Sequence, residues 1–125
     1  MKSGMELIES IKAAAIGMLA DELIFAFPEV LDVIKQCSTN EIAVLGVEVH
    51  KALGDQYQTQ YLSTYDLRVP RSDVGRDTWT NYVQINNTLA DEFVRQNPTG
   101  DEHVYVLTTS SWREFCQIQG RREDV

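Results

Sequence analysis

The sequence predicts an α+β fold in which helices pack on one face of a small, mostly antiparallel sheet, made of a hairpin and a C-terminal strand. One observation is composition: 125 residues, 43% hydrophobic and 24% charged, suit one folded domain. The others are helix-like apolar spacing near both ends of the chain and strand-like alternation over residues 57–69. No linker or repeat divides the sequence, so residues 1–125 are expected to form a single domain with a frayed tail at residues 119–125.

Two helices are predicted in the first third of the chain. Over residues 5–23, apolar side chains recur at steps of three and four, and consecutive alanines add helix propensity. Pro28 suits the first turn of a second, short helix, because the missing N–H is not needed there. The apolar side of that helix consists of Val30, Leu31, Val33, Ile34 and Cys37.

Residues 41–53 fit either a helix that ends at Gly54 or a strand with near-alternating apolar residues. We favour the strand because Gly54-Asp55 has turn chemistry and a long β-prone run follows it. The two segments then form a β-hairpin. The alternate positions of the second segment are Tyr57, Thr59, Tyr61, Ser63, Tyr65, Leu67 and Val69.

The second half predicts a loop, a helix, a strand and a final helical turn. Residues 70–77 are polar and contain Pro and Gly, and Asp77 or Thr78 then caps a helix that ends before Pro98. Residues 103–109 form a strand, and Ser110 or Ser111 caps the last turn. The expected core residues are Trp79, Tyr82, Leu89 and Phe93 in the helix, and Trp112, Phe115 and Ile118 in the last turn.

Charge limits the classes of partner. Acidic residues outnumber basic residues 19 to 11, which gives a net charge of −8. This charge repels nucleic-acid phosphates and anionic membrane surfaces, so neither nucleic acid nor a membrane is an expected partner. Glu6 and Glu9 interrupt the apolar stretch that a signal peptide needs, so we expect a cytoplasmic location.

No cofactor or metal is predicted. The glycines never stand at the spacing of a dinucleotide-binding or P-loop motif. The only histidines are His50 and His103, and Cys37 and Cys116 lie far apart in the sequence, so no familiar metal-ligand spacing occurs. We expect both thiols to be buried in the core.

Glu48 and His50 are the strongest candidates for chemistry. On a strand they share one face about 7 Å apart, near enough to share a proton, a metal or a bound group. Metal-dependent nucleases typically place an acid and a lysine two positions apart, whereas Lys51 follows Glu48 by three and faces the other way. We therefore favour a charged pair on the solvent face of a strand. The alternative is a small hydrolase or nuclease-like enzyme in which Asp66 adds a carboxylate, with or without a metal.

Tyr57, Tyr61 and Tyr65 recur at four-residue steps, which place them on one face of either a strand or a helix. Tyrosine is enriched at protein interfaces because it offers contact area at low entropic cost and keeps a hydroxyl for hydrogen bonding. Two interpretations stay open: the tyrosines bind a partner or a second copy, or a helix covers them as part of the core.

Adjacent acids form local negative patches, and Asp91-Glu92 and Asp101-Glu102 are the pairs that we expect to contact a basic protein. For any single pair, solubility is the simpler interpretation. The leading hypothesis is a non-enzymatic, acidic protein-binding module that docks a basic partner, with self-association as the alternative. In size and charge such a module resembles bacterial immunity proteins and inhibitors of basic nuclease toxins.

Overall fold

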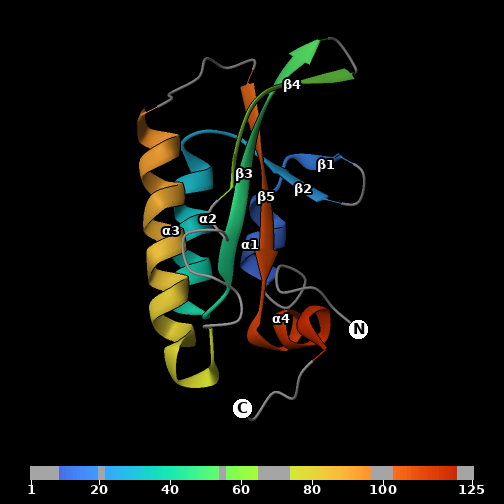
Figure 1. Ribbon diagram of the computed structural model, residues 1–125. Coiled ribbons are helices and arrows are strands. Elements are labelled where there is room, and N and C mark those ends of the chain that lie inside the picture. The colour runs from blue at the N-terminus through green and yellow to red at the C-terminus, as the bar shows by residue number, and fades with distance from the viewer. Residues whose placement is uncertain (1–8, 20–21, 54–55, 65–73, 97–102, 121–125) are drawn as a thin grey trace.

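The computed structural model describes residues 9–19, 22–53, 56–64, 74–96 and 103–120 (Figure 1). In the first third, two short strands lie between two helices, and the two longest strands follow. The order is α1 (Glu9–Ala14), β1 (Gly17–Leu19), β2 (Glu22–Phe25), α2 (Glu29–Thr39), β3 (Ala43–Leu53), β4 (Gln56–Thr64), the 3₁₀ helix η3 (Arg76–Thr78), α3 (Trp79–Gln96), β5 (His103–Ser110) and α4 (Trp112–Gln119).

The described strands form one antiparallel sheet in the order β1-β2-β5-β3-β4. The C-terminal strand β5 lies in the centre, where it pairs with both β2 and β3. Helices α2 and α3 run antiparallel to each other on one face of the sheet (Figure 1). The predicted α+β fold, with a hairpin, a C-terminal strand and helices on one face, is confirmed.

The predicted helix over residues 5–23 is wrong in its second half. Helix α1 ends at Ala14, and residues 17–19 and 22–25 form the antiparallel strands β1 and β2. Ile24 and Phe25 are buried because β2 pairs with β5, opposite Val106 and Tyr105. Pairing with a strand that lies far along the chain thus overrides the helical spacing, which is a local signal.

The favoured strand over residues 41–53 and the hairpin that follows it are confirmed by the pairing of β3 with β4. The parts of the predicted β-prone run and of the predicted loop that fall at residues 65–73 lie outside the described residues.

Strand β3 contains a bulge that simple alternation does not predict. In β3, Val44 pairs with Thr109 and Gly46 with Thr108, so Leu45 is an extra residue. Because of this bulge, Val44 and Val47 are both buried in the same cluster.

Helix α2 begins after Pro28, as predicted, and ends in a Schellman motif. The Ile42 N–H donates to the Cys37 carbonyl at 2.8 Å, and the Glu41 N–H donates to the Ser38 carbonyl at 3.2 Å. Glu41 occupies the left-handed position, with φ 56°, where glycine is more usual. The Trp79 indole N–H donates to the Glu41 carbonyl at 3.0 Å, and the Thr80 hydroxyl donates to the Glu41 carboxylate, so contacts from α3 hold this conformation.

Helix α3 begins directly after η3, in which Thr78 Oγ1 accepts a hydrogen bond from the Gly75 N–H at 2.9 Å. Of the predicted core residues, Trp79 and Tyr82 are buried, whereas Leu89 and Phe93 are only partly buried. The buried face of α3 is rotated relative to the predicted apolar face, because two asparagines lie on it. The buried residues of α3 are Trp79, Tyr82, Val83, Asn86, Asn87, Ala90 and Val94.

Helix α4 begins where the sequence predicts, with Ser111 as its N-cap. The Ser111 hydroxyl accepts from the Glu114 N–H at 3.2 Å, and the Glu114 carboxylate accepts from the Ser111 N–H at 2.9 Å, which forms a capping box. The prediction for Ile118 is wrong, because its side chain is 67% exposed. Cys116 takes the inward position instead, since it follows buried Trp112 by four residues, about one helical turn.

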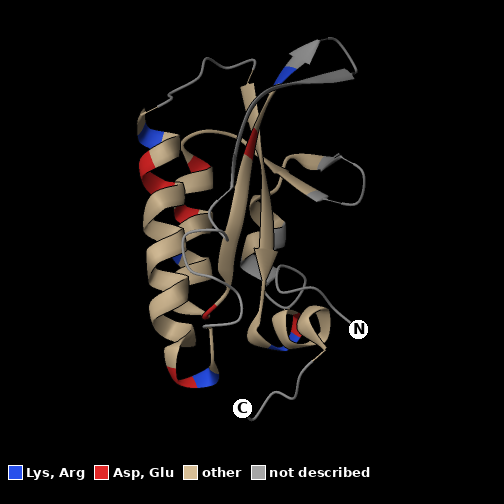
Figure 2. Cartoon of the chain, in the orientation of Figure 1, with Lys and Arg blue, Asp and Glu red and all other residues tan. Residues whose placement is uncertain are grey.

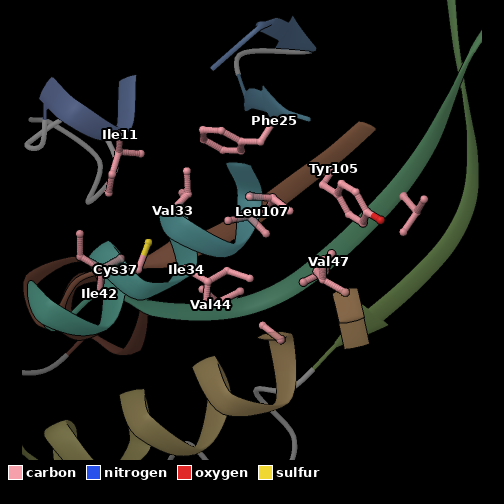
Figure 3. Packing of buried hydrophobic residues seen from close by; sticks show 14 residues of the cluster. Ile11, Phe25, Val33, Ile34, Cys37, Ile42, Val44, Val47, Tyr105 and Leu107 are labelled. Atoms are coloured by element: carbon pink, nitrogen blue, oxygen red, sulfur yellow. The ribbon is translucent and has the colours of Figure 1, made fainter. Parts of the chain in front are cut away.

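Two clusters of buried side chains hold the sheet and helices together. The aliphatic cluster lies between the sheet and helices α1, α2 and α3 (Figure 3). The aromatic cluster joins the start of α3 to α4. The aliphatic cluster consists of Ile11, Phe25, Val30, Val33, Ile34, Cys37, Ile42, Val44, Val47, Val49, Ala90, Val94, Tyr105 and Leu107. The aromatic cluster consists of Ala43, Val74, Trp79, Tyr82, Val83, Trp112, Phe115 and Cys116.

Both cysteines are buried free thiols, as predicted, one in each cluster. Burial raises the pKa of the Cys37 thiol to about 12 because a thiolate is poorly solvated there. Of the helices that the structure describes, none is both long and apolar enough to span a membrane.

Candidate functional site

Strand β3 brings Glu48 and His50 into contact. Their side chains lie on the sheet face opposite the helices, because the alternate residues Val47 and Val49 belong to the aliphatic cluster. His50 Nε2 is 3.0 Å from Glu48 Oε1, and the side chains are 5% and 30% exposed, respectively. The expectation of a solvent-exposed pair is wrong for His50, which is buried. Val104 and Val106, which pair with His50 and Glu48 on β5, are buried as well.

A carboxylate that holds one imidazole nitrogen is the orienting half of a general acid–base system. Catalysis also requires access for a substrate, and the His50 ring is almost entirely covered. Within the described ranges, no group of three or more His, Cys, Asp or Glu side chains is arranged to hold a metal. The third predicted member, Asp66, lies outside the described residues. The contact therefore gives the buried imidazole of His50 a hydrogen-bond partner. For catalysis it supplies the orienting carboxylate alone.

A groove of about 380 Å³ lies between α2 and α3. Partly buried Leu31, beside the core residue Ile34 of α2, gives it an apolar wall, and charged side chains of both helices surround it. We call this surface the α2–α3 groove. The lining residues are Leu31, Ile34, Lys35, Ser38, Asn87, Thr88, Asp91, Glu92 and Arg95.

Asn87 fixes the geometry of this groove by linking α3 to α2 and β3. Its Oδ1 accepts from the Val44 N–H at 2.7 Å, and its Nδ2 donates to Ser38 Oγ at 2.9 Å and to the Ile42 carbonyl at 3.0 Å. The amide thus satisfies buried backbone groups on the neighbouring segment. Sequence periodicity missed Asn87 because a polar residue in a helix is normally assigned to the solvent side.

The acidic side chains on the two helices have different local explanations. Glu29 and Asp32 lie in the first turn of α2, where a helix dipole favours negative charge. Asp91 and Glu92 lie near the C-terminal end of α3, where the dipole does not favour it. Asp91 accepts a hydrogen bond from Arg95 Nε at 2.5 Å. Figure 2 shows acidic residues on α2 and on the neighbouring end of α3.

The structure describes only some of the other predicted binding residues. Tyr57 pairs with Ala52 and Tyr61 with Val49, and a register shift between them leaves Gln60 without a partner on β3. Uninterrupted alternation, the premise for one shared face in a strand, does not hold across this bulge. Tyr65, Asp101 and Glu102 lie outside the described residues. The tyrosine and Asp101-Glu102 surfaces therefore stay predictions.

Comparisons with protein-family models, with curated proteins and with solved structures give no match to this chain. The α2–α3 groove and the Glu48–His50 contact are the two features of the described residues that bear on function.

Proposed function

We propose that this protein is a binding module that docks a basic protein partner at the α2–α3 groove, in the manner of an inhibitor or an immunity-type protein. The observation that carries the proposal is the position of Asp91 and Glu92 beside a concave surface with an apolar wall. A groove of this kind offers both parts of a protein interface, a desolvated apolar centre and a charged rim.

Glu92 is the acid of the groove that is most accessible to a partner, because Asp91 is paired with Arg95. It is exposed and precedes the last turn of α3, where the helix dipole gives a carboxylate no stabilisation, while the first turn of α3, which favours an acid, contains none. The helix dipole therefore does not account for its position. A cationic side chain of a partner that reaches the groove rim meets Glu92.

The charge around the groove favours a cationic partner. The charged residues that line the groove balance, with Asp91 and Glu92 against Lys35 and Arg95. Outside the lining, the first turn of α2 adds two acids, Glu29 and Asp32, so the six residues together have a net charge of −2. The overall charge of −8 extends this attraction beyond contact distance and raises the association rate. Binding is then strongest at low salt, because salt screens exposed charges.

The test is affinity capture from the native host's lysate at low and high salt, with three forms of the tagged protein. Glu92→Lys reverses the rim charge, and Asp77→Lys makes the same change in net charge at η3, near the opposite end of α3. The wild type and Asp77→Lys are expected to retain one basic protein stoichiometrically at low salt. Glu92→Lys is expected to retain about tenfold less. Equal retention by both variants, or retention that salt does not reduce, contradicts the proposal.

The 3.0 Å contact between Glu48 and His50 supports a second candidate, a small hydrolase or nuclease-like enzyme. Its test is hydrolysis of a chromogenic phosphodiester and a chromogenic ester, with and without added divalent cations. Activity in the wild type that is lost in both Glu48→Gln and His50→Gln supports this candidate. Activity that persists in both variants, or no activity in the wild type, removes it.

A further inference from the structure

We propose that β4 pairs with β4 of a second copy of this chain across a two-fold axis, so that the two sheets join edge to edge. This inference concerns a different surface from the α2–α3 groove and does not depend on the proposed function. It rests on the position, length and chemistry of β4.

The sheet has two edges of very different length. Strand β1 contains three residues, whereas β4 contains nine and is paired on one side, along eight register positions of β3. No strand among the described residues lies beyond β4. A long edge strand presents a row of backbone N–H and C=O groups that can pair with another strand.

Strand β4 lacks the residues that usually protect such an edge. Its sequence, QYQTQYLST, contains no charged residue and no proline, although 24% of the whole chain is charged. Charges and prolines at an edge normally prevent pairing between chains. The one protective device in β4 is the bulge at Gln60, which leaves regular segments at positions 56–59 and 61–64.

The absence of charge on β4 favours pairing with a second copy over binding of the basic partner. Two chains of net charge −8 repel each other, and like charges opposite one another destabilise a strand pair. Antiparallel pairing of two β4 strands brings no charged side chains of β4 opposite each other. A basic partner finds no acidic residue on this strand.

Among the described residues, the end of the β3–β4 hairpin extends past the elements next to it. The register of β5 on β3 begins at Lys51, so Ala52 and Leu53 continue the hairpin beyond the neighbouring strand. Figure 1 shows the tip of β3 and β4 extending past the end of α3. In an edge-to-edge dimer, the α2–α3 groove stays on the helical side of each copy, so both surfaces can be occupied together.

The experiment measures molar mass by light scattering after gel filtration, over a series of protein concentrations. The wild type is expected to reach about 28 kDa, twice the 14.2 kDa of one chain. Gln58→Lys/Gln60→Lys adds two charges to β4, and Gln84→Lys/Gln96→Lys adds two to exposed positions of α3 as the matched control. The β4 variant is expected to stay monomeric and the α3 variant to dimerise like the wild type.

A second measurement keeps the test decisive if the β4 variant fails to fold. Backbone amide exchange in wild-type β4 is expected to slow as protein concentration rises, while exchange in α3 does not change. A wild type that stays at the mass of one chain at every concentration overturns the proposal. A folded β4 variant that dimerises as well as the control also overturns it. Neither assay contains the basic partner, so failure here leaves the capture experiment unaffected.

Discussion

The aliphatic and aromatic clusters stabilise the same helix α3 by different means. The aliphatic cluster gathers mostly Val and Ile side chains from three helices and three strands, so each contributes a small part of the buried area. The aromatic cluster depends on four rings, and Trp79 lies at its centre, with ring centroids of Tyr82, Trp112 and Phe115 at 5.3, 5.4 and 5.3 Å. Stability is thus distributed in one cluster and concentrated in the other.

Two adjacent amides on α3 show a second contrast. Asn87 forms three hydrogen bonds to neighbouring segments. Asn86 is fully buried, and neither its Oδ1 nor its Nδ2 has a hydrogen-bond partner in the part of the chain that the structure describes. One amide therefore compensates its burial and the other does not.

The largest expected effect is the loss of the Trp79 ring. Trp79→Ala is expected to lower the free energy of unfolding by about 4 kcal/mol, because it leaves a cavity and removes the hydrogen bond to the Glu41 carbonyl. Val33→Ala in the aliphatic cluster is expected to lower it by about 2 kcal/mol. Urea denaturation of both variants measures the difference. Equal losses contradict the idea that stability is concentrated in the aromatic cluster.

Asn87→Ala is expected to lower the free energy of unfolding by about 3 kcal/mol. The substitution leaves the Val44 N–H and the Ile42 carbonyl without the partner that they have in the native protein. Urea denaturation gives the loss, and amide exchange at Val44 reports the broken contact directly. A loss below that of Val33→Ala would show that Asn87 is not the main link between α3 and β3.

The buried thiol in the aliphatic cluster predicts a pH effect. The pKa of Cys37 is about 12 in the folded protein, against 9.0 for an ordinary thiol, so above pH 9 the unfolded chain binds fewer protons. Unfolding is then favoured as pH rises from 9 toward 12, by about 1 kcal/mol per pH unit from this group. Urea midpoints between pH 8 and 10 are expected to fall more steeply for the wild type than for Cys37→Val. Parallel pH profiles argue against this burial effect.

The smallest expected effect has the opposite sign. Asn86→Leu replaces an amide that has no described hydrogen-bond partner with an apolar side chain of similar size, and is expected to raise the free energy of unfolding by about 1 kcal/mol. Thermal unfolding of Asn86→Leu and Asn87→Leu side by side checks the comparison. A lower melting temperature in both would mean that the two amides act alike.

Sequence patterns predict the elements that carry strong local signals. The alternation in β3, Pro28 at the start of α2 and the Ser111 cap of α4 each depend on neighbouring residues, and all three predictions are confirmed. The β1–β2 hairpin is missed because it depends on pairing with β5, more than 70 residues away. Asn86 and Asn87 conceal the core face of α3 for a related reason. Their burial is decided by what packs on them, which periodicity does not report.

The candidate site too is predictable where the signal is local and not where it depends on distant segments. The pattern of β3 predicts that Glu48 and His50 share a face, and they are in contact. It does not predict that His50 is buried, because the residues that cover a sheet face come from elsewhere in the chain. The groove beside Asp91 and Glu92 requires two helices separated by about 50 residues, so the acids are visible in the sequence and the groove is not.

The central position of β5 has a consequence for the order in which the chain can assemble during synthesis. The β1–β2 and β3–β4 hairpins are made first, yet β2 and β3 meet only through β5, which starts at His103. Until that strand leaves the ribosome, the nascent protein carries two separate hairpins, each with an unpaired inner strand. Premature termination before His103 yields a product prone to aggregate, because both β2 and β3 then lack their central neighbour.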